Sequence, residues 1–461
     1  MHTDEAVNAY IVGELLAGQK YSYDPEDRHG PALVALALPL VRLQGAKTFA
    51  ELTETELRRT PALAGTATIL LFGAATEMFG FASCLIAAML FACAPLTVYY
   101  DRYFIHESLF VAATFGLILC GWYACVRRSA KLAALAAACA AVMLACKETA
   151  VLHFAALAGA ALLYWLLNLR RKNNHDLWRP RMLLTAVLVF LLLSVALFTW
   201  FGTNWGALTA LAPAAANFAA RAVGEGHAQP FWYYARIVAG GRSGALICIV
   251  ACIGLLLAVR KREASPFAWL AYYAVFIFVL YSAIPYKTPW LALNFWLPIA
   301  LLAGMTATAL WHVPVKHLTA RVVLRTSCLV GAVVVAALIA HDTRQRVFLH
   351  PADEGNPYAY AHTAEDLLGL PTELAEMVHQ EGLASPRIAV IAADPWPLPW
   401  YLRKYAQVGY WQPGQTVGQT DFYITSTDAA NQYADQLKNC HADFFGERPG
   451  VLILLWSPVP K

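Results

Sequence analysis

The stretch MLLTAVLVFLLLSVALFTWF at residues 182–201 decides the fold class of this chain, because its twenty residues carry no charged side chain. A helix rises about 1.5 Å per residue, so about 20 apolar residues cross the hydrocarbon core of a membrane. Nine further segments are also predominantly apolar, at approximately residues 60–79, 80–98, 105–125, 130–146, 149–168, 243–260, 266–284, 290–310 and 322–340. The sequence therefore predicts an all-α polytopic membrane domain of about ten spans.

The composition of the whole chain supports this fold class. Of its 461 residues, 59% are hydrophobic and 14% charged, whereas soluble domains average about 45–50% apolar and about a quarter charged residues. These values exclude a disordered chain and most soluble enzymes. The net charge of +4 is too small to indicate a nucleic-acid partner. Nine of the ten cysteines lie in apolar stretches between Cys84 and Cys328, which indicates small hydrophobic residues rather than a disulfide framework.

The positive charges predict the orientation in the membrane, because Lys and Arg in short loops stay on the cytoplasmic side. Alternate loops hold fourteen of them: Arg127, Arg128, Lys131, Arg170, Arg171, Lys172, Arg179, Arg181, Arg260, Lys261, Arg262, Lys316, Arg321 and Arg325. The opposite loops hold six: Arg102, Lys147, Arg221, Arg236, Arg242 and Lys287. We therefore expect the first set inside, and residues 1–59 and the C-terminal region outside.

The composition becomes that of a soluble domain after about residue 341. Residues 387–392, 422–425 and 451–455 read as buried strands, and 363–382 and 428–439 as helices, so we expect a small extracytoplasmic α/β domain. The predicted organisation is an external loop with interfacial helices and an Asp-Glu motif (1–59), a transmembrane domain (60–340) and the α/β domain (341–461).

Acidic residues gather on the external side, where ionisable groups at a membrane edge indicate a site. The segment MHTDEA at residues 1–6 opens a helical run from Val7 to Ala17. In one interpretation Thr3 or Asp4 caps this helix, and Glu5 favours its positive end. In the other, a carboxylate of this motif accepts a proton from an incoming nucleophile.

Two further external motifs combine acidic, basic and aromatic residues. The segment YDPEDRHGP at residues 23–31 is either a solvated acidic turn or a site segment that contributes His29. In YYDRYFIHES at 99–108, the spacing places Arg102 and His106 on one helix face, as it does Tyr103 and Glu107. Ion pairing at a hairpin explains this pattern, and so does an Arg102 fork on a phosphate, with His106 and Glu107 orienting it or the acceptor.

Two segments add lysines at external membrane edges. Lys147 and Glu148 in CKET at 146–149 are either a snorkelling pair or binding residues. Lys287 lies between two prolines in IPYKTPW at 284–290, and the prolines stiffen the loop that presents it. The sequence contains no phosphate-binding loop, dinucleotide fingerprint, zinc-protease motif or nucleophile elbow.

Taken in order, these motifs resemble the flippase-activity-associated proteins of archaea and bacteria. This family is a branch of the GT-C superfamily of membrane glycosyltransferases, which includes the protein O-mannosyltransferases and the aminoarabinose transferases of lipid A. The residues that carry the resemblance span nearly the whole chain: MHTDEAVNAY, YDPEDRHGP, YYDRYFIHES, CKET, IPYKTPW, NPYAYAHT at 356–363 and WPLPWYLR at 396–403.

The resemblance implies an enzyme that transfers a sugar from a polyprenyl-phosphate carrier outside the membrane. Asp4, followed by Glu5, matches the catalytic base; His29 matches the His of the HGP segment; Arg102 and Lys287 match basic positions near the carrier phosphate. The mannosyltransferase branch requires no cofactor, whereas related oligosaccharyltransferases use a divalent metal. Superfamily members begin with a membrane helix before the Asp-Glu motif, so we expect an upstream in-frame segment of about 20 apolar residues.

The leading hypothesis is an inverting, hexosyltransferase-like GT-C glycosyltransferase in the cell (inner) membrane, with its active face extracytoplasmic. Asp4 and Glu5 are the catalytic candidates. The candidates for binding substrate or phosphate are His29, Arg102, His106, Glu107, Lys147, Glu148 and Lys287. The expected partners are a polyprenyl-phosphate-linked sugar and membrane lipid, with no nucleic acid, no metal and no cofactor. The alternative is a non-catalytic or flippase-associated protein that binds or moves lipid-linked sugars.

Overall fold

The computed structural model describes residues 1–24, 28–168, 179–223, 228–260 and 265–459, in two compact units. Unit 1 combines Met1–Gln19, Ala37–Leu57 and Ala352–Lys461, and unit 2 combines Lys20–Leu36 and Arg58–Pro351. Residues 25–27 of the second external motif lie outside the described residues, as do five of the loop charges: Arg170, Arg171, Lys172, Lys261 and Arg262.

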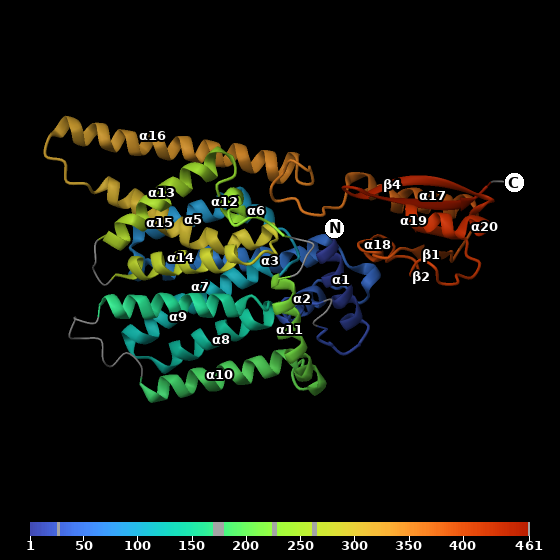
Figure 1. Cartoon of the computed structure of the whole chain (residues 1–461), viewed down its shortest axis with the longest axis horizontal. Coiled ribbons are helices and arrows are strands. Elements are labelled where there is room, and N and C mark those ends of the chain that lie inside the picture. Colours follow the sequence, from blue (N-terminus) through green and yellow to red (C-terminus); the bar gives the residue numbers. More distant parts are fainter. Residues whose placement is uncertain (25–27, 169–178, 224–227, 261–264, 460–461) are drawn as a thin grey trace. The chain divides into compact units, whose positions relative to one another are not determined.

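Unit 2 is helical, and each of the ten apolar segments forms helix, as predicted (Figure 1). The helices are α3 (Glu54–Ala74), α5 (Phe81–Cys93), α7 (Glu107–Arg127), α8 (Ala130–Cys146), α9 (Ala150–Leu167), α10 (Pro180–Phe198), α13 (Gly241–Arg260), α14 (Pro266–Ala283), α15 (Leu293–Trp311) and α16 (Leu318–Thr343). Short α4 (Thr76–Phe79) and α6 (Pro95–Tyr100) follow α3 and α5. The segments of α11 (Leu211–Val223) and α12 (Tyr233–Val238) lie between α10 and α13.

Local sequence explains where these helices start and stop. Ser129 and Ser265 cap α8 and α14, their side chains accepting hydrogen bonds from Leu132 N and Ala268 N. Pro180 stands in the first turn of α10, where a missing N–H costs nothing. Pro95 separates α5 from α6, because the residue before a proline avoids the helical conformation.

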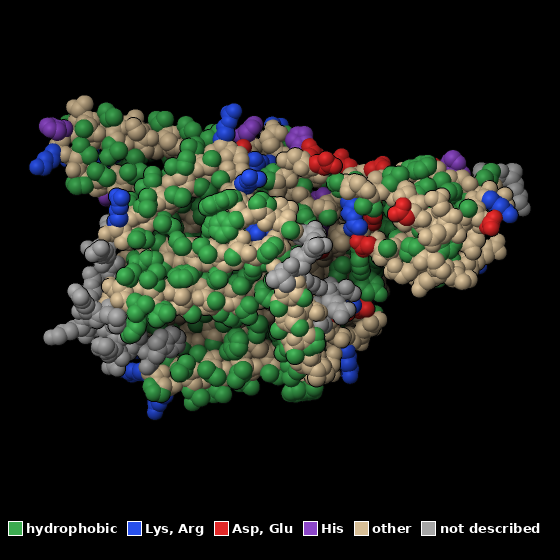
Figure 2. All heavy atoms as spheres, viewed as in Figure 1, with side chains coloured by type: hydrophobic (Ala, Val, Ile, Leu, Met, Phe, Trp, Pro, Cys, Tyr) green, Lys and Arg blue, Asp and Glu red, His purple; other side chains and the backbone are tan. Residues whose placement is uncertain are grey.

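The surface of unit 2 is apolar, as a lipid-facing surface requires. Among the residues that the structure describes, seven stretches are long and apolar enough to cross a membrane: those of α7, α9, α10, α13, α14, Pro289–Trp311 and Leu318–Leu349. Large hydrophobic side chains such as Leu192 and Val333 point outward, each 69% exposed. Figure 2 shows hydrophobic side chains over much of the visible face of these helices. Such a surface is stable only in lipid, so the chain is an integral membrane protein.

Small residues bring the helices of unit 2 into close contact. A Cβ atom added at Gly304 of α15 would collide with the backbone of Ser83 in α5, and one at Gly254 of α13 with the backbone of Leu302. Small residues at such contacts let backbones approach, which is how helices gain packing energy in lipid. Buried aromatic rings fill the interior, including the tilted pair Phe72 and Phe115, whose centroids lie 4.9 Å apart.

Unit 1 contains a five-stranded sheet in the order β2-β1-β3-β5-β4. Strands β1 (Arg387–Ile391), β2 (Gln407–Trp411) and β3 (Phe422–Ser426) are parallel, whereas β5 (Val451–Pro458) is antiparallel to β3 and to β4 (Cys440–Arg448). The three predicted strands are confirmed. Strands β2 and β4 were not predicted, because these edge strands are only partly buried and lack a continuous apolar run.

Helices and the N-terminal segments complete unit 1. Its helices include α1 (Thr3–Leu16), η1 (Phe49–Glu51), η5 (Glu365–Leu368), α17 (Leu370–Gln380) and α18 (Leu398–Tyr401). Helix α2 (Ala32–Leu43) and α3 cross from one unit to the other. The helix predicted at 428–439 is divided into α19 (Thr427–Ala430), η6 (Asn431–Tyr433) and α20 (Ala434–Leu437). Tyr433 and Leu437 pack there against buried strand residues such as Ile391.

We expect Gly304→Ala to lower the stability of unit 2 by about 1–3 kcal/mol, because overpacking forces backbone shifts. Thermal unfolding in detergent measures the effect. Gly331→Ala is the matched control, since Gly331 lies in α16 with no atom within 4 Å of an added Cβ, and alanine favours helix. Equal stability of the two variants would contradict tight packing at Gly304.

Candidate active site

The Asp-Glu motif lies in the first turn of α1, in unit 1. His2 is the N-cap residue, and its Nδ1 accepts the Asp4 N–H at 3.1 Å. The carboxylate of Glu5 accepts the His2 N–H at 3.0 Å, which completes a capping box. The prediction that Thr3 or Asp4 caps this helix is therefore wrong. His2 was not predicted as the cap, because N-cap residues are usually Ser, Thr, Asp or Asn.

The two carboxylates of this motif differ in environment. Glu5 is fully buried and holds the backbone of His2, whereas Asp4 is partly exposed. The amide groups of the first helical turn favour a negative charge at either position. Of the two, Asp4 is the carboxylate that a substrate can reach.

Helix α1 is held by aromatic side chains within unit 1. The ring of Tyr10 meets those of Phe49 and Trp396 edge-on, with centroids 5.6 and 5.8 Å apart. The Phe49 ring also covers Gly13, where an added Cβ would collide with it. The WPLPW segment at 396–400 thus packs around the helix that carries Asp4.

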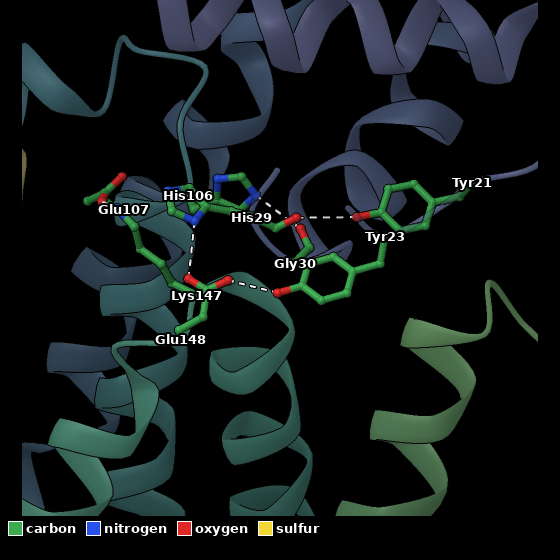
Figure 3. Close-up of polar contacts among 8 residues, drawn as sticks. All are labelled: Tyr21, Tyr23, His29, Gly30, His106, Glu107, Lys147 and Glu148. Carbon is green, nitrogen blue, oxygen red and sulfur yellow. Dashed lines mark hydrogen bonds and ion pairs between the residues drawn. The ribbon is translucent and has the colours of Figure 1, made fainter. Parts of the chain in front are cut away.

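A second set of polar residues lies in unit 2, around Glu148. Its carboxylate accepts hydrogen bonds from the Tyr23 hydroxyl at 2.9 Å and from His29 Nδ1 at 3.2 Å (Figure 3). Burial alone would raise the pKa of Glu148, but the hydrogen bonds and the charge of His29 outweigh it and lower the pKa to about 2. The contribution of the ionised Glu148 carboxylate to the stability of unit 2 is therefore complete above about pH 4.5 and is lost as the pH falls through about 2.

Contacts to the backbone of Gly30 fix the position of the HGP segment at residues 29–31. The carbonyl of Gly30 accepts a hydrogen bond from His106 Nε2 at 3.1 Å, so this nitrogen carries the proton (Figure 3). His106 is buried and its burial holds its pKa well below the usual value, so the ring is neutral. A Cβ atom at position 30 would collide with the Ala145 carbonyl, which explains the glycine. The rings of His29 and His106 meet edge-on at 5.5 Å.

Lys147 and Glu107 form a buried ion pair next to this set. Their side chains are 9% and 2% exposed, and the Lys147 ammonium lies 5.9 Å from the centre of the Trp290 ring. The pairing of Lys147 with its neighbour Glu148, one of the two interpretations drawn from the sequence, is wrong. The Glu107 carboxylate is paired with Lys147, and the Glu148 carboxylate accepts a hydrogen bond from His29.

The segment from Asp101 to His106 consists of turns and bends, and α7 begins at Glu107. The prediction that Arg102 and His106 share a helix face is therefore wrong, as it is for Tyr103 and Glu107. The Arg102 side chain is exposed, bonds the Val347 carbonyl at 3.4 Å and lies 4.9 Å from the Phe348 ring centre. Most of its N–H donors have no partner among the described residues.

Asp101, in the YYDRYFIHES motif, is a further buried carboxylate that was not among the predicted site residues. Its carboxylate lies against Gly65, where an added Cβ would collide with it, and its Oδ1 has no hydrogen-bond partner in the described part of the chain. Burial raises the pKa of Asp101 to about 7. Only its place in the YYDRYF motif pointed to it.

Lys287 is 1% exposed and donates to the carbonyls of Gln229 at 2.9 Å and Ile284 at 2.5 Å. Burial lowers its pKa. Within unit 2, the structure thus gathers His29, His106, Glu107, Lys147 and Glu148, while Arg102 and Lys287 contact other segments. Asp4 and Glu5 belong to unit 1. Within the described ranges no three His, Cys, Asp or Glu side chains are grouped to hold a metal ion.

Comparison with solved structures identifies the fold as GT-C type. The crystal structure of ArnT from Cupriavidus metallidurans bound to undecaprenyl phosphate is 16% identical, with a TM-score of 0.68 over 98% of this chain and 93% of that one. The archaeal oligosaccharyltransferase AglB from Archaeoglobus fulgidus, in complex with an inhibitory peptide and a dolichol-phosphate, is 12% identical, with a TM-score of 0.57 over 99% and 70%. No family model and no curated protein sequence matches the chain.

We expect Lys147→Met to destabilise unit 2 by roughly 3–5 kcal/mol, because it leaves the Glu107 carboxylate buried without its cation. Adding Glu107→Gln to the same variant should restore most of the loss. Thermal unfolding of both variants in detergent measures the difference. A single variant as stable as the unchanged protein would show that the pair does not hold α7 and α8 together.

Proposed function

We propose that this protein is a membrane glycosyltransferase that transfers a sugar from a polyprenyl-phosphate carrier to an acceptor. The observation that supports this most strongly is the fold match along nearly the whole chain to a structure that holds undecaprenyl phosphate. The charged residues within this apolar fold add to it, because ionisable groups near a membrane mark sites. The resemblance carried by the sequence motifs favours the flippase-activity-associated branch and a hexosyltransferase-like enzyme.

In this proposal Asp4 is the general base. It takes the proton of an acceptor hydroxyl as the hydroxyl oxygen forms a bond to the anomeric carbon of the donor. The bond between that carbon and the phosphate oxygen breaks, and the carrier phosphate leaves with the electron pair, so the anomeric configuration inverts. Asp4 suits this role because it is partly exposed, whereas Glu5 is occupied by the capping box.

The departing phosphate requires positive charge. Arg102 is exposed and presents N–H donors in the planar arrangement that matches phosphate oxygens. We assign it the main contact, with Lys287 as a second cation whose ammonium is held by two carbonyls. Lys147 is committed to Glu107, so its contribution is to the shape and charge balance of the site. His29, His106 and Glu148 orient the HGP segment at residues 29–31.

The described carboxylates do not provide a cage for a divalent cation. In unit 2, Glu107 and Glu148 are bound to Lys147 and His29, and Asp101 is buried with a raised pKa. We therefore derive no step through a metal. The asymmetry of Lys and Arg between the two sets of loops favours transfer on the outer face of the cell membrane.

A non-catalytic protein that binds or moves lipid-linked sugars would share the phosphate site and would not need a base. We expect Asp4→Asn to reduce transfer by roughly 10²–10⁴-fold, since a general base contributes about that much, while donor affinity stays unchanged. Radiolabelled sugar transfer and donor binding measure the two quantities. Asp428→Asn, which removes an exposed carboxylate from α19, is the control. Full transfer by Asp4→Asn would exclude the proposed base.

We expect Arg102→Ala to weaken donor affinity by about tenfold or more, because a charge-assisted hydrogen bond contributes about 1.5–3 kcal/mol. Arg102→Lys should lose less, since it keeps the charge and loses the planar donor arrangement. Lipid-donor binding and thermal unfolding are measured on the same variants, with Lys316→Ala as an exposed control. If Arg102 instead only anchors the Val347 backbone, stability falls and affinity per folded molecule does not.

A further inference from the structure

Both ring nitrogens of His2 are engaged, in a way that fixes its protonation state. Nδ1 accepts the backbone N–H of Asp4 at 3.1 Å, so Nδ1 carries no proton. Nε2 lies 2.8 Å from the carbonyl of Tyr360, which can only accept, so Nε2 carries the proton. The side chain is buried at 5% exposure. The contacts are therefore satisfied by one neutral tautomer alone.

The partner of His2 is the NPYAYAHT segment, which the proposed function does not use. Thr363 Oγ1 donates to the carbonyl of Met1 at 2.6 Å, and the His362 ring lies 5.1 Å from the His2 ring. His362 Nδ1 in turn accepts the Tyr360 N–H at 3.1 Å. Residues 360–363 thus dock on the start of α1, within unit 1, and His2 is the side chain that binds both.

We propose that His2 is a positioning residue: as a neutral imidazole it locks the Asp4 turn of α1 to residues 360–363, and its protonation releases that turn. The inference rests on the proposed function, because Asp4 is the base. It assigns no chemical step to His2. Asp4 is correctly placed only while His2 Nδ1 accepts the Asp4 N–H and His2 Nε2–H donates to the Tyr360 carbonyl.

Protonation would place an N–H against the Asp4 N–H, and the capping bond would be lost. Several charges face the ring besides the aromatic His362. Burial lowers the His2 pKa most, the negative charges of Asp4 and Glu5 raise it, and positive charge, including that of Arg448, lowers it; the net effect is a lowered pKa. The lock is therefore complete above about pH 6.5, the ordinary value, and is lost as the pH falls below it through the lowered pKa.

Two substitutions separate the two bonds. In His2→Asn, a short amide oxygen still caps α1 but does not reach Tyr360, whereas His2→Ala loses both bonds. His379→Ala, an exposed histidine of α17 in the same unit, is the matched control. Hydrogen exchange of full-length protein in detergent reads residues 3–8 and 356–363 without any assay of activity.

At pH 7.5 we expect His2→Ala to speed exchange of the first α1 turn by about fivefold, the usual effect of losing a cap. His2→Asn should restore that turn but leave residues 356–363 exchanging faster than in the unchanged protein. Lowering the pH stepwise below 6.5, after correction for intrinsic exchange, should loosen both segments in the unchanged protein and neither further in His2→Asn. The same pH response in both proteins, or unaltered exchange at 356–363 in His2→Asn, would overturn the proposal.

Sugar transfer supplies the second readout. We expect His2→Asn to lower kcat by roughly ten- to a hundredfold, the cost of a misplaced catalytic group, with the KM for the lipid donor unchanged and the acid limb of the pH profile altered. If His2→Asn has the same stability and kcat as the unchanged protein, His2 acts only as a helix cap and the proposal is wrong. If the unchanged protein transfers no sugar, the proposed function fails, while the exchange measurements still decide whether His2 couples the two segments.

Discussion

A bilayer interior offers no partner to a charge or a hydrogen-bonding group, and the arrangement of polar residues in unit 2 follows from that constraint. Lys147 is matched by Glu107, and Glu148 by His29 and Tyr23. His153 Nδ1 in α9 likewise forms a hydrogen bond with the Tyr273 hydroxyl of α14 at 2.9 Å. Each match joins segments far apart in the chain, so the requirement that polar groups be satisfied also selects which helices become neighbours.

The same constraint explains what the sequence could reveal. Ten apolar segments fold as helices because the length and polarity of a membrane helix are local properties that a window of about 20 residues contains. The presence of charged residues at helix ends was equally visible. Their partners were not, because the choice between Glu107 and Glu148 for Lys147 depends on how α7 and α8 meet. Adjacent positions suggested the wrong pair.

Other sequence-based predictions were wrong where the backbone is not regular helix or strand, so that residue spacing did not determine which side chains share a face. Arg102 and His106 are four residues apart, yet turns between Asp101 and His106 prevent them from sharing a face. Edge strands β2 and β4 lack the apolar runs that revealed β1, β3 and β5, since only central strands are buried on both faces. His2 showed no signal as a cap, because caps are usually Ser, Thr, Asp or Asn, and its contact with Tyr360 joins residues far apart in the chain. The roles assigned to the candidate site residues remain predictions.

Unit 1 is assembled from the beginning, an early segment and the end of the chain, and this has a topological consequence. Because Leu57 and Ala352 belong to one compact body, the polypeptide between them must cross the bilayer an even number of times. The ribosome also delivers α1 long before its C-terminal partners, α18 and residues 360–363, exist. Closure of unit 1 around α1 must therefore wait until the end of the chain has been synthesised, which makes it a late event of biogenesis.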